Sequence, residues 1–192
     1  MRISQKSKFK IQNSKSGYTL IELLAVTSII VIVTGLIVGV LYSTLRGGSK
    51  TKITNDVSQN GNYALSVISN IALNAESVTN VGGTDISDCT TLQEGNSIEF
   101  KKADGSRLSF SCASDSIASS SGTTTTYLID NASVKVDPVS CNFSCFQSDA
   151  NPYSSPIIGV SFTVSQSKGS SFENLASSSF KTSVTMRNYN PR

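Results

Sequence analysis

The sequence predicts an α+β fold, in which one long N-terminal helix precedes an antiparallel β-sheet. Three observations predict it. Residues 23–45 form a largely apolar run without a charged side chain. Apolar residues then recur at steps of three and four between Ile53 and Val78, which is typical of a helix with one buried face. Beyond Asp85 the period changes to two, which is typical of strands.

Basic residues are concentrated before the apolar run. Residues 1–17, called the leader below, carry five of the chain's 16 Lys and Arg side chains and no Asp or Glu. Without the leader, 11 basic side chains face 13 acidic ones, so the net charge changes from +3 to −2. The alkaline pI is therefore poor support for nucleic-acid binding, and nucleic acid stays an unsupported alternative as a partner.

The apolar run is long enough to cross a membrane. At 1.5 Å per residue its 23 residues span about 35 Å, against a hydrocarbon core of about 30 Å. It is too long for an ordinary secretory signal. The basic leader favours a cytoplasmic N-terminus, although Arg46, Lys50 and Lys52 weaken the asymmetry. We expect a single-pass protein of the cytoplasmic membrane, in contact with lipid, with the residues after 45 outside.

Glu22 lies one turn inside the apolar segment, where a membrane makes a carboxylate costly. An acid costs about 2.5–3.5 kcal/mol at the centre of a membrane helix and less toward an end. If the chain were cut after Gly17, Tyr18 would gain a free α-amine four residues from Glu22. This amine would offset the carboxylate within one helix or between staggered neighbours. The alternative is that Glu22 faces lipid headgroups and needs no partner.

The stretch KSGYTLIELLAVTSIIVIV resembles the N-terminal signal of prepilins and pseudopilins, the subunits of type IV pili and type II secretion systems. In that signal a basic leader ends in Gly, an aromatic residue follows, and a Glu occupies the fifth mature position of an apolar helix. The resemblance implies cleavage after Gly17, methylation of the new amine of Tyr18, and a role for Glu22 in assembly. The family usually has Phe after the cleaved bond, so Tyr18 is a departure.

The resemblance also implies an architecture and a set of partners. The expected parts are a cleaved leader (1–17), a transmembrane and assembly helix (18–45), its amphipathic continuation (46–80) and an extracytoplasmic β-rich domain (81–192), together a type IV pilin-like fold. The implied partners are other pilin subunits through the N-terminal helix, the prepilin peptidase and the inner-membrane assembly platform. The mature protein would end in an extracellular filament.

Two glycines inside the apolar helix, Gly35 and Gly39, have the four-residue spacing that lets helices approach closely. We predict a role in helix packing for them. The alternative is that glycine is simply tolerated in a membrane helix. After them, the amphipathic pattern predicts a helix over residues 50–79, which ends at Val81–Thr84 (VGGT).

The remaining chain predicts strands. Ile98–Phe100 and Leu108–Cys112 alternate around the turn signal ADGS and predict a hairpin. Residues 119–126 and 165–179 are Ser-rich and predict loops. Further strands are predicted at 127–129, 134–136, 158–164 and 180–186.

Four cysteines in an extracytoplasmic domain predict two disulfides. We favour Cys89–Cys112 and Cys141–Cys145. In a straight strand Cys141 and Cys145 would be about 13 Å apart, so their pairing requires a turn at CNFSC. If that segment is straight, one or both must pair with Cys89 or Cys112 instead. A four-cysteine zinc site is disfavoured because no two cysteines are spaced as Cys-x2-Cys.

The chain contains no histidine, which removes Ser–His–Asp and Cys–His catalysis, and it has no phosphate-binding or dinucleotide motif. We expect no enzyme, catalytic residue, cofactor or metal. Three hypotheses follow: a minor pilin or pseudopilin that acts in filament initiation or at the tip, an adhesive or ligand-binding tip domain (including one for DNA uptake) on a pilin anchor, and an uncleaved anchored domain. Residues 60–78 and 180–189 resemble the larger minor pilins and J-type pseudopilins.

Overall fold

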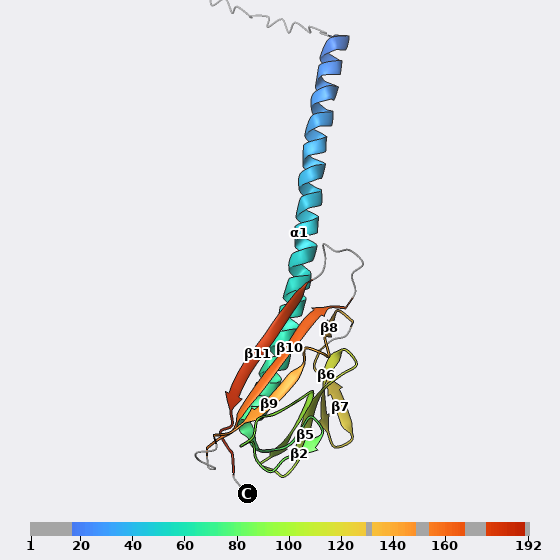
Figure 1. Ribbon diagram of the computed structural model, residues 1–192. Helices are drawn as coiled ribbons and strands as arrows, with labels where there is room; N and C mark the ends of the chain where they lie inside the picture. The colour runs from blue at the N-terminus through green and yellow to red at the C-terminus, as the bar shows by residue number, and fades with distance from the viewer. Residues whose placement is uncertain (1–16, 130–131, 149–153, 168–175, 191–192) are drawn as a thin grey trace, which may run out of the picture. The chain divides into compact units, whose positions relative to one another are not determined.

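The computed structural model describes residues 17–129, 132–148, 154–167 and 176–190, and its elements are shown in Figure 1. It is an α+β protein with one long N-terminal helix, α1 (Leu20–Asn74), and antiparallel sheets. The chain divides into two compact units, with the boundary between Arg46 and Gly47.

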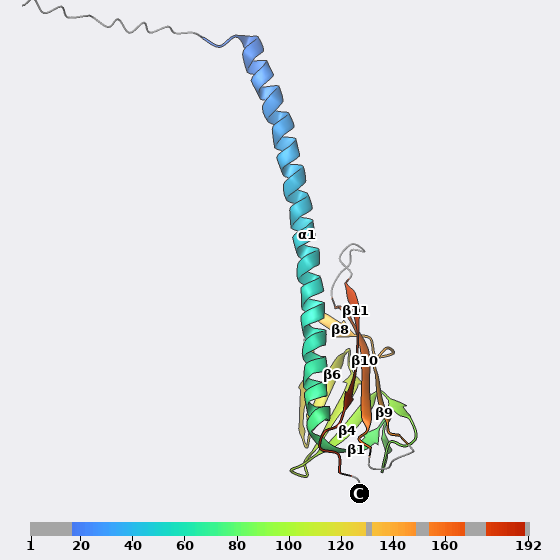
Figure 2. The same ribbon diagram turned by 90° about the vertical axis from the view of Figure 1, so that its left-hand side faces the viewer.

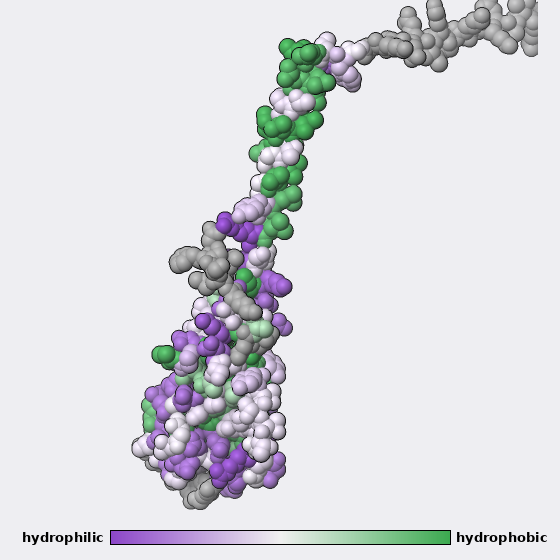
Figure 3. Space-filling model, turned by 90° about the vertical axis from the view of Figure 1, so that its right-hand side faces the viewer, coloured by the Kyte–Doolittle hydropathy of each residue, from purple (hydrophilic) through white to green (hydrophobic). Residues whose placement is uncertain are grey.

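The first unit is the N-terminal part of α1. Every described side chain in it is exposed, including all of its Leu, Ile and Val residues. Figure 3 shows hydrophobic side chains along this part of the helix. In the described part of the chain, α1 is the helix that is long and apolar enough to cross a membrane. An apolar surface of this kind needs lipid or other protein around it, because water would leave it unfavourably hydrated.

In the second unit, the C-terminal half of α1 packs on the sheets through a narrow stripe of buried residues. Their steps of three and four place them on one face of the helix. The buried residues of α1 are Val57, Gly61, Ala64, Ile68 and Ala72. Most of these side chains are small, so the helix axis lies close to the strands, as Figure 2 shows.

The helix is shorter than predicted. It ends at Asn74 rather than at residue 79, and Ala75 and Val78 are buried in strand β1 (Ala75–Val81). The spacing of the apolar residues was misleading here, because a strand with both faces covered also shows apolar residues three apart. VGGT does not end the helix. It forms the turn between β1 and β2 (Thr84–Asp85), where Gly82 and Gly83 have φ values of 61° and 86°.

One sheet has the strand order β2-β1-β4-β5-β6-β7. The predicted hairpin is confirmed as β4 (Ser97–Lys102) and β5 (Arg107–Ala113). The loop predicted over residues 119–126 is wrong, since β6 (Ser116–Ser121) and β7 (Thr124–Tyr127) pair there. Gly122, with φ of 59°, permits the tight turn, and the hydroxyls of Ser120 and Thr125 are 2.9 Å apart across the pair.

The other sheet has the order β11-β10-β9-β3, with β8 also paired to β10. Its strands are β3 (Gln93–Gly95), β8 (Val134–Val136), β9 (Asn142–Phe146), β10 (Ile157–Gln166) and β11 (Ser177–Thr185). The strands predicted at 134–136, 158–164 and 180–186 are confirmed, apart from Met186. Only Tyr127 of the strand predicted at 127–129 is in β7. The loop predicted over residues 165–179 is wrong at both ends, because residues 165–166 belong to β10 and residues 177–179 to β11. Its residues 168–175 lie outside the described residues.

Both sheets contribute to one hydrophobic core, whereas the sequence predicted a single sheet under the helix. The rings of Phe100 and Phe110, from the first sheet, meet edge to face at 6.3 Å. The rings of Phe162 and Phe180, from the second, stack at 5.6 Å. All four side chains are buried. The second sheet lies beside α1 (Figure 1), and its strand β11 contacts the helix where the Phe180 ring lies against Gly61.

Candidate functional site

The candidate site lies where α1 begins. Gly17, Tyr18 and Thr19 are exposed and outside the helix, which starts at Leu20. The Leu23 N–H donates to the Thr19 carbonyl (3.2 Å), and the Glu22 N–H donates to Thr19 Oγ1 (3.4 Å). Thr19 is therefore the N-cap, and its hydroxyl satisfies an N–H that the helix itself leaves unpaired. Sequence analysis missed this residue, although Thr-x-x-Glu before an apolar run signals a helix start.

Glu22 lies in the first turn of α1 and is exposed. A negative charge is favoured at this end of a helix, where unpaired N–H groups leave a partial positive charge. Tyr18 is joined to Gly17 in this chain, so the α-amine predicted to offset the Glu22 carboxylate does not exist before cleavage. The pairing of the two groups stays a prediction.

Gly35 and Gly39 are exposed on the same helix, and a Cβ placed on either would meet no atom within 4 Å outside the adjoining helix backbone. The helix surface at both positions is therefore open to a close neighbour. Their part in helix packing depends on a second helix and stays a prediction.

The predicted disulfide pairing is wrong. Cys89 pairs with Cys145, with Cα atoms 5.5 Å apart, and Cys112 pairs with Cys141, with Cα atoms 6.3 Å apart. The reason is that CNFSC is not a turn: Cys145 lies within β9 and Cys141 directly precedes it. Two residues four apart along an extended segment point to the same face but are too far apart to bond. All four cysteines are thus in disulfides, which leaves no thiolate for a zinc site.

One disulfide links the two sheets, and the other links the second sheet to the connection between β2 and β3. Cys112 is on β5 of the first sheet, and its partner Cys141 leads into β9 of the second. Cys89 lies in the connection from β2 to β3, and its partner Cys145 faces Gln93 of β3 across the ladder. Both crosslinks therefore hold β9 to the rest of the domain.

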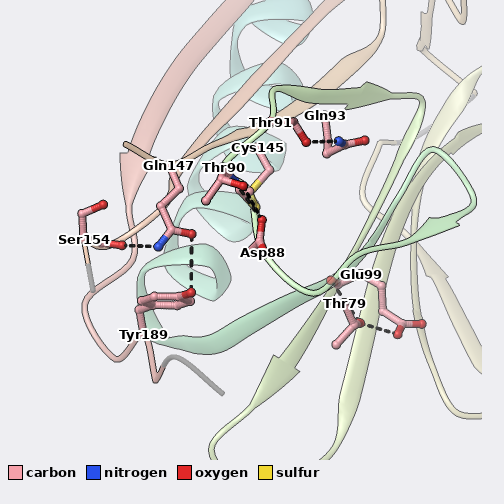
Figure 4. The surroundings of a disulfide bond; sticks show 11 residues. Thr79, Asp88, Thr90, Thr91, Gln93, Glu99, Cys145, Gln147, Ser154 and Tyr189 are labelled. Carbon is pink, nitrogen blue, oxygen red and sulfur yellow. Dashed lines mark hydrogen bonds between the residues drawn. A yellow bond between two sulfur atoms is a disulfide. The ribbon is translucent and has the colours of Figure 1, made fainter. Parts of the chain in front are cut away.

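A buried glutamine lies next to the Cys89–Cys145 bond, as Figure 4 shows. Gln147 is 1% exposed, and its backbone N–H donates to the Cys89 carbonyl at 2.7 Å. Its Nε2 donates to the Ser154 carbonyl (2.8 Å), and its Oε1 accepts from the Tyr189 hydroxyl at a longer 3.4 Å. No pattern in the sequence marks this residue, because its partners lie far apart along the chain.

The segment after β11 forms backbone hydrogen bonds at and just beyond the C-terminus of α1. The Arg187 N–H donates to the Leu73 carbonyl (3.0 Å), and the Asn190 N–H donates to the Glu76 carbonyl (3.1 Å). The Leu73 carbonyl is one of the last four of the helix, which have no partner within it. The C-terminal segment, and not the VGGT stretch at which the helix was predicted to end, thus pairs with a carbonyl at the end of α1.

The basic hairpin between β4 and β5 is largely neutralised. Lys101 forms an ion pair with Glu76 (2.9 Å), and Arg107 forms one with Glu99 (3.1 Å). Glu99 also accepts a hydrogen bond from Thr79 Oγ1 at 2.6 Å. The second unit therefore offers no strongly cationic surface at this hairpin.

The described residues contain no group of three or more His, Cys, Asp or Glu side chains that could hold a metal.

The comparison with known proteins matches the same end of the chain. A family model described as the prokaryotic N-terminal methylation motif matches residues 12–38, which include Gly17, Tyr18, Glu22 and Gly35. No curated protein and no solved structure matches the chain. The match covers the start of α1 and does not extend to the sheets.

Proposed function

We propose that this chain, a type IV pilin-like protein by its N-terminal methylation motif, is a minor pilin or pseudopilin. It would be a structural subunit of a type IV pilus or a type II secretion-like filament, with a role in initiation or at the tip. One observation carries the proposal: Gly17 and Tyr18 lie exposed before a long, exposed apolar helix that has Glu22 in its first turn. The motif family is structural rather than enzymatic.

The proposed sequence of events begins in the membrane. The prepilin peptidase removes the leader after Gly17, and the new amine of Tyr18 is methylated. Until assembly, the apolar part of α1 is held in the bilayer with the globular unit outside the cytoplasm. The assembly platform then transfers the subunit to a filament, where other pilin helices cover the surface that lipid covered before.

Glu22 gives this transfer a preferred register. An unpaired carboxylate among apolar side chains is costly, and a neighbouring subunit's N-terminal amine would offset it. Arrangements that leave the charge unpaired are disfavoured, so the same interaction that stabilises the correct stagger also selects against the wrong one. Gly35 and Gly39 would let neighbouring helices approach closely in that stagger.

The experiment that tests this proposal measures both leader cleavage and entry into filaments in the same set of variants. Wild type, Gly17→Val and Tyr18→Phe would be expressed with the machinery of the source cell, and the N-terminus of each product determined by mass spectrometry. We expect wild type and Tyr18→Phe to begin at residue 18 with a methylated amine and to enter sheared filaments. Gly17→Val should stay full-length in the membrane, because a side chain replaces the hydrogen next to the scissile bond. A wild-type protein that keeps its leader would overturn the proposal.

An exposed apolar row on the second sheet favours a second candidate, an adhesive or ligand-binding domain on a pilin anchor. Phe146 and Ile157 are direct cross-strand partners and are 46% and 42% exposed, and Leu92, next to β3, is 58% exposed. Exposed apolar groups clustered in this way mark contact surfaces. A Phe146→Ser variant that enters filaments normally but no longer supports attachment would favour this candidate, and an unchanged attachment would oppose it.

A further inference from the structure

We propose that Thr19 is a positioning residue for leader removal: it starts the helix at Leu20 and thereby keeps the Gly17–Tyr18 bond in open backbone. This inference rests on the proposed cleavage after Gly17. Thr19 acts through the conformation of the scissile bond and needs no contact with the peptidase.

The capping contacts identify the residue that sets the helix start. The Thr19 carbonyl accepts the first hydrogen bond of α1, from Leu23, and the Thr19 hydroxyl accepts one from the Glu22 N–H. An N-cap residue has non-helical dihedrals, so the chain before it does not continue the helix. Gly17 and Tyr18 accordingly lie outside α1 and are exposed.

The margin between the scissile bond and the helix is narrow. Tyr18, on the C-terminal side of the scissile bond, directly precedes the N-cap residue Thr19. A helix that began one turn earlier would therefore include the Gly17–Tyr18 bond. The sequence offers a competing cap three residues upstream, because Ser is also a preferred N-cap and Ser16 precedes Gly17. A membrane favours the earlier start, since helical hydrogen bonds satisfy backbone groups that lipid cannot. Thr19 opposes that extension.

The chemistry of hydrolysis needs the bond outside the helix. Water adds to the Gly17 carbonyl carbon, the C–N bond breaks, and the products are the Gly17 carboxylate and the Tyr18 amine. In a helix extended through Gly17, that carbonyl would accept the N–H of Ile21 and would be enclosed by the turn. Outside the helix it stays free for attack and for stabilisation of the developing oxyanion.

Four variants of the full-length precursor separate this role from direct recognition of the hydroxyl. Thr19→Ala removes the cap and introduces the best helix former, whereas Thr19→Ser and Thr19→Asn retain a capping side chain. Thr19→Val keeps the shape of threonine without the hydroxyl. Each would be incubated in membranes with a prepilin peptidase, and the rate of leader removal measured.

We expect Thr19→Ala to be cleaved about five-fold more slowly than wild type. A typical N-cap side chain favours its own helix start over a competing one by about this factor. Thr19→Val should be slowed less, because valine is a poorer helix former. Thr19→Ser and Thr19→Asn should stay within about two-fold of wild type. In precursor labelled with ¹⁵N-isoleucine, the Ile21 amide should exchange with solvent fast in wild type, where it precedes the first intrahelical hydrogen bond, and slowly in Thr19→Ala, where it would donate to the Gly17 carbonyl.

Three results would overturn the inference. One is cleavage of Thr19→Ala at the wild-type rate, and another is slow cleavage without any change in Ile21 amide exchange. The third is a loss in Thr19→Asn as large as that in Thr19→Ala, which would mean that the peptidase recognises the hydroxyl itself. A wild-type chain that is not cleaved after Gly17 would instead refute the proposed function, so the two failures are distinguishable.

Discussion

The ring of Phe180 occupies the space that a side chain at Gly61 would need. A Cβ on Gly61 would overlap the Phe180 ring atoms, and that ring is buried and stacked on Phe162. Glycine at this position of α1 is therefore required by the strand that packs against it. It does not serve to end or bend the helix.

Gly61→Ala should destabilise the protein by about 1–2 kcal/mol, since overpacking outweighs the better helix propensity of alanine. Gly48→Ala is the matched control, because a Cβ there meets nothing within 4 Å and should stabilise by about 0.5–1 kcal/mol. Chemical denaturation of the detergent-solubilised chain measures both. Phe180→Leu should recover part of the loss in Gly61→Ala, so additive effects of the two substitutions would contradict the contact.

Removing either disulfide should lower the free energy of unfolding substantially. The crosslinks close loops of 56 residues for Cys89–Cys145 and 29 residues for Cys112–Cys141. The chain-entropy estimate gives about 4 kcal/mol for the first and about 3.5 kcal/mol for the second. Paired Cys→Ser variants and urea unfolding would measure these losses.

Peptide mapping of unreduced protein checks the pairing itself. A peptide containing Cys89 should be crosslinked to one containing Cys145, and a peptide containing Cys112 to one containing Cys141. A proteolytic cut between residues 141 and 145 is required to distinguish the alternatives. A Cys89–Cys112 crosslink would contradict the structure.

Glu22→Val should leave membrane insertion and leader removal intact but reduce assembly. The substitution removes a charge from the apolar helix, so its partition into lipid does not suffer. What it removes is the pairing with a neighbour's amine, for which coupling energies of about 1.5 kcal/mol or more correspond to at least ten-fold less incorporation. Quantitative blotting of sheared filaments measures it.

Glu22→Gln separates the charge of Glu22 from its size, and Glu94→Gln on strand β3 controls for the general loss of one acid. We expect Glu22→Gln to fail like Glu22→Val, and Glu94→Gln to assemble normally. Wild-type incorporation of both Glu22 variants would show that this carboxylate only faces the membrane interface.

The connection between β2 and β3 should contribute a pH-dependent part of the stability. Hydrogen bonds from the Thr90 hydroxyl and then the Thr90 N–H, at 2.6 and 3.1 Å, lower the pKa of Asp88. A lowered carboxyl pKa stabilises the fold above the pKa of the unfolded chain, about 3.9, and that contribution is lost as the pH falls further.

The difference in melting temperature between wild type and Asp88→Asn should therefore be present at pH 7 and shrink at pH 3. Comparing the two proteins at each pH cancels the titration of other carboxyls, including Asp104, whose pKa is also lowered, mainly by the Ser106 hydroxyl. Thr90→Val should have no pH-dependent effect of its own in the Asp88→Asn background. A difference that stays constant between pH 7 and pH 3 would contradict this account.

Local sequence determined the features that depend on neighbouring residues. The uncharged apolar run and the spacing of Gly17, Tyr18 and Glu22 identified the long apolar helix and its motif, because both are properties of one continuous segment. The hairpin from Ile98 to Cys112 was predictable for the same reason: alternation and turn residues are local signals. The Thr19 cap was equally local and was overlooked.

Only the tertiary structure decided the features that depend on distant segments. Ala75 and Val78 fit a helix by their spacing, but pairing with β4 makes them part of a strand. The disulfide partners follow from β9 being straight and lying between β3 and β10, and its pairing with β3 involves residues some 50 positions apart. Gly61 had no evident role until Phe180 was placed against it, since a contact across 119 positions leaves no trace in local periodicity.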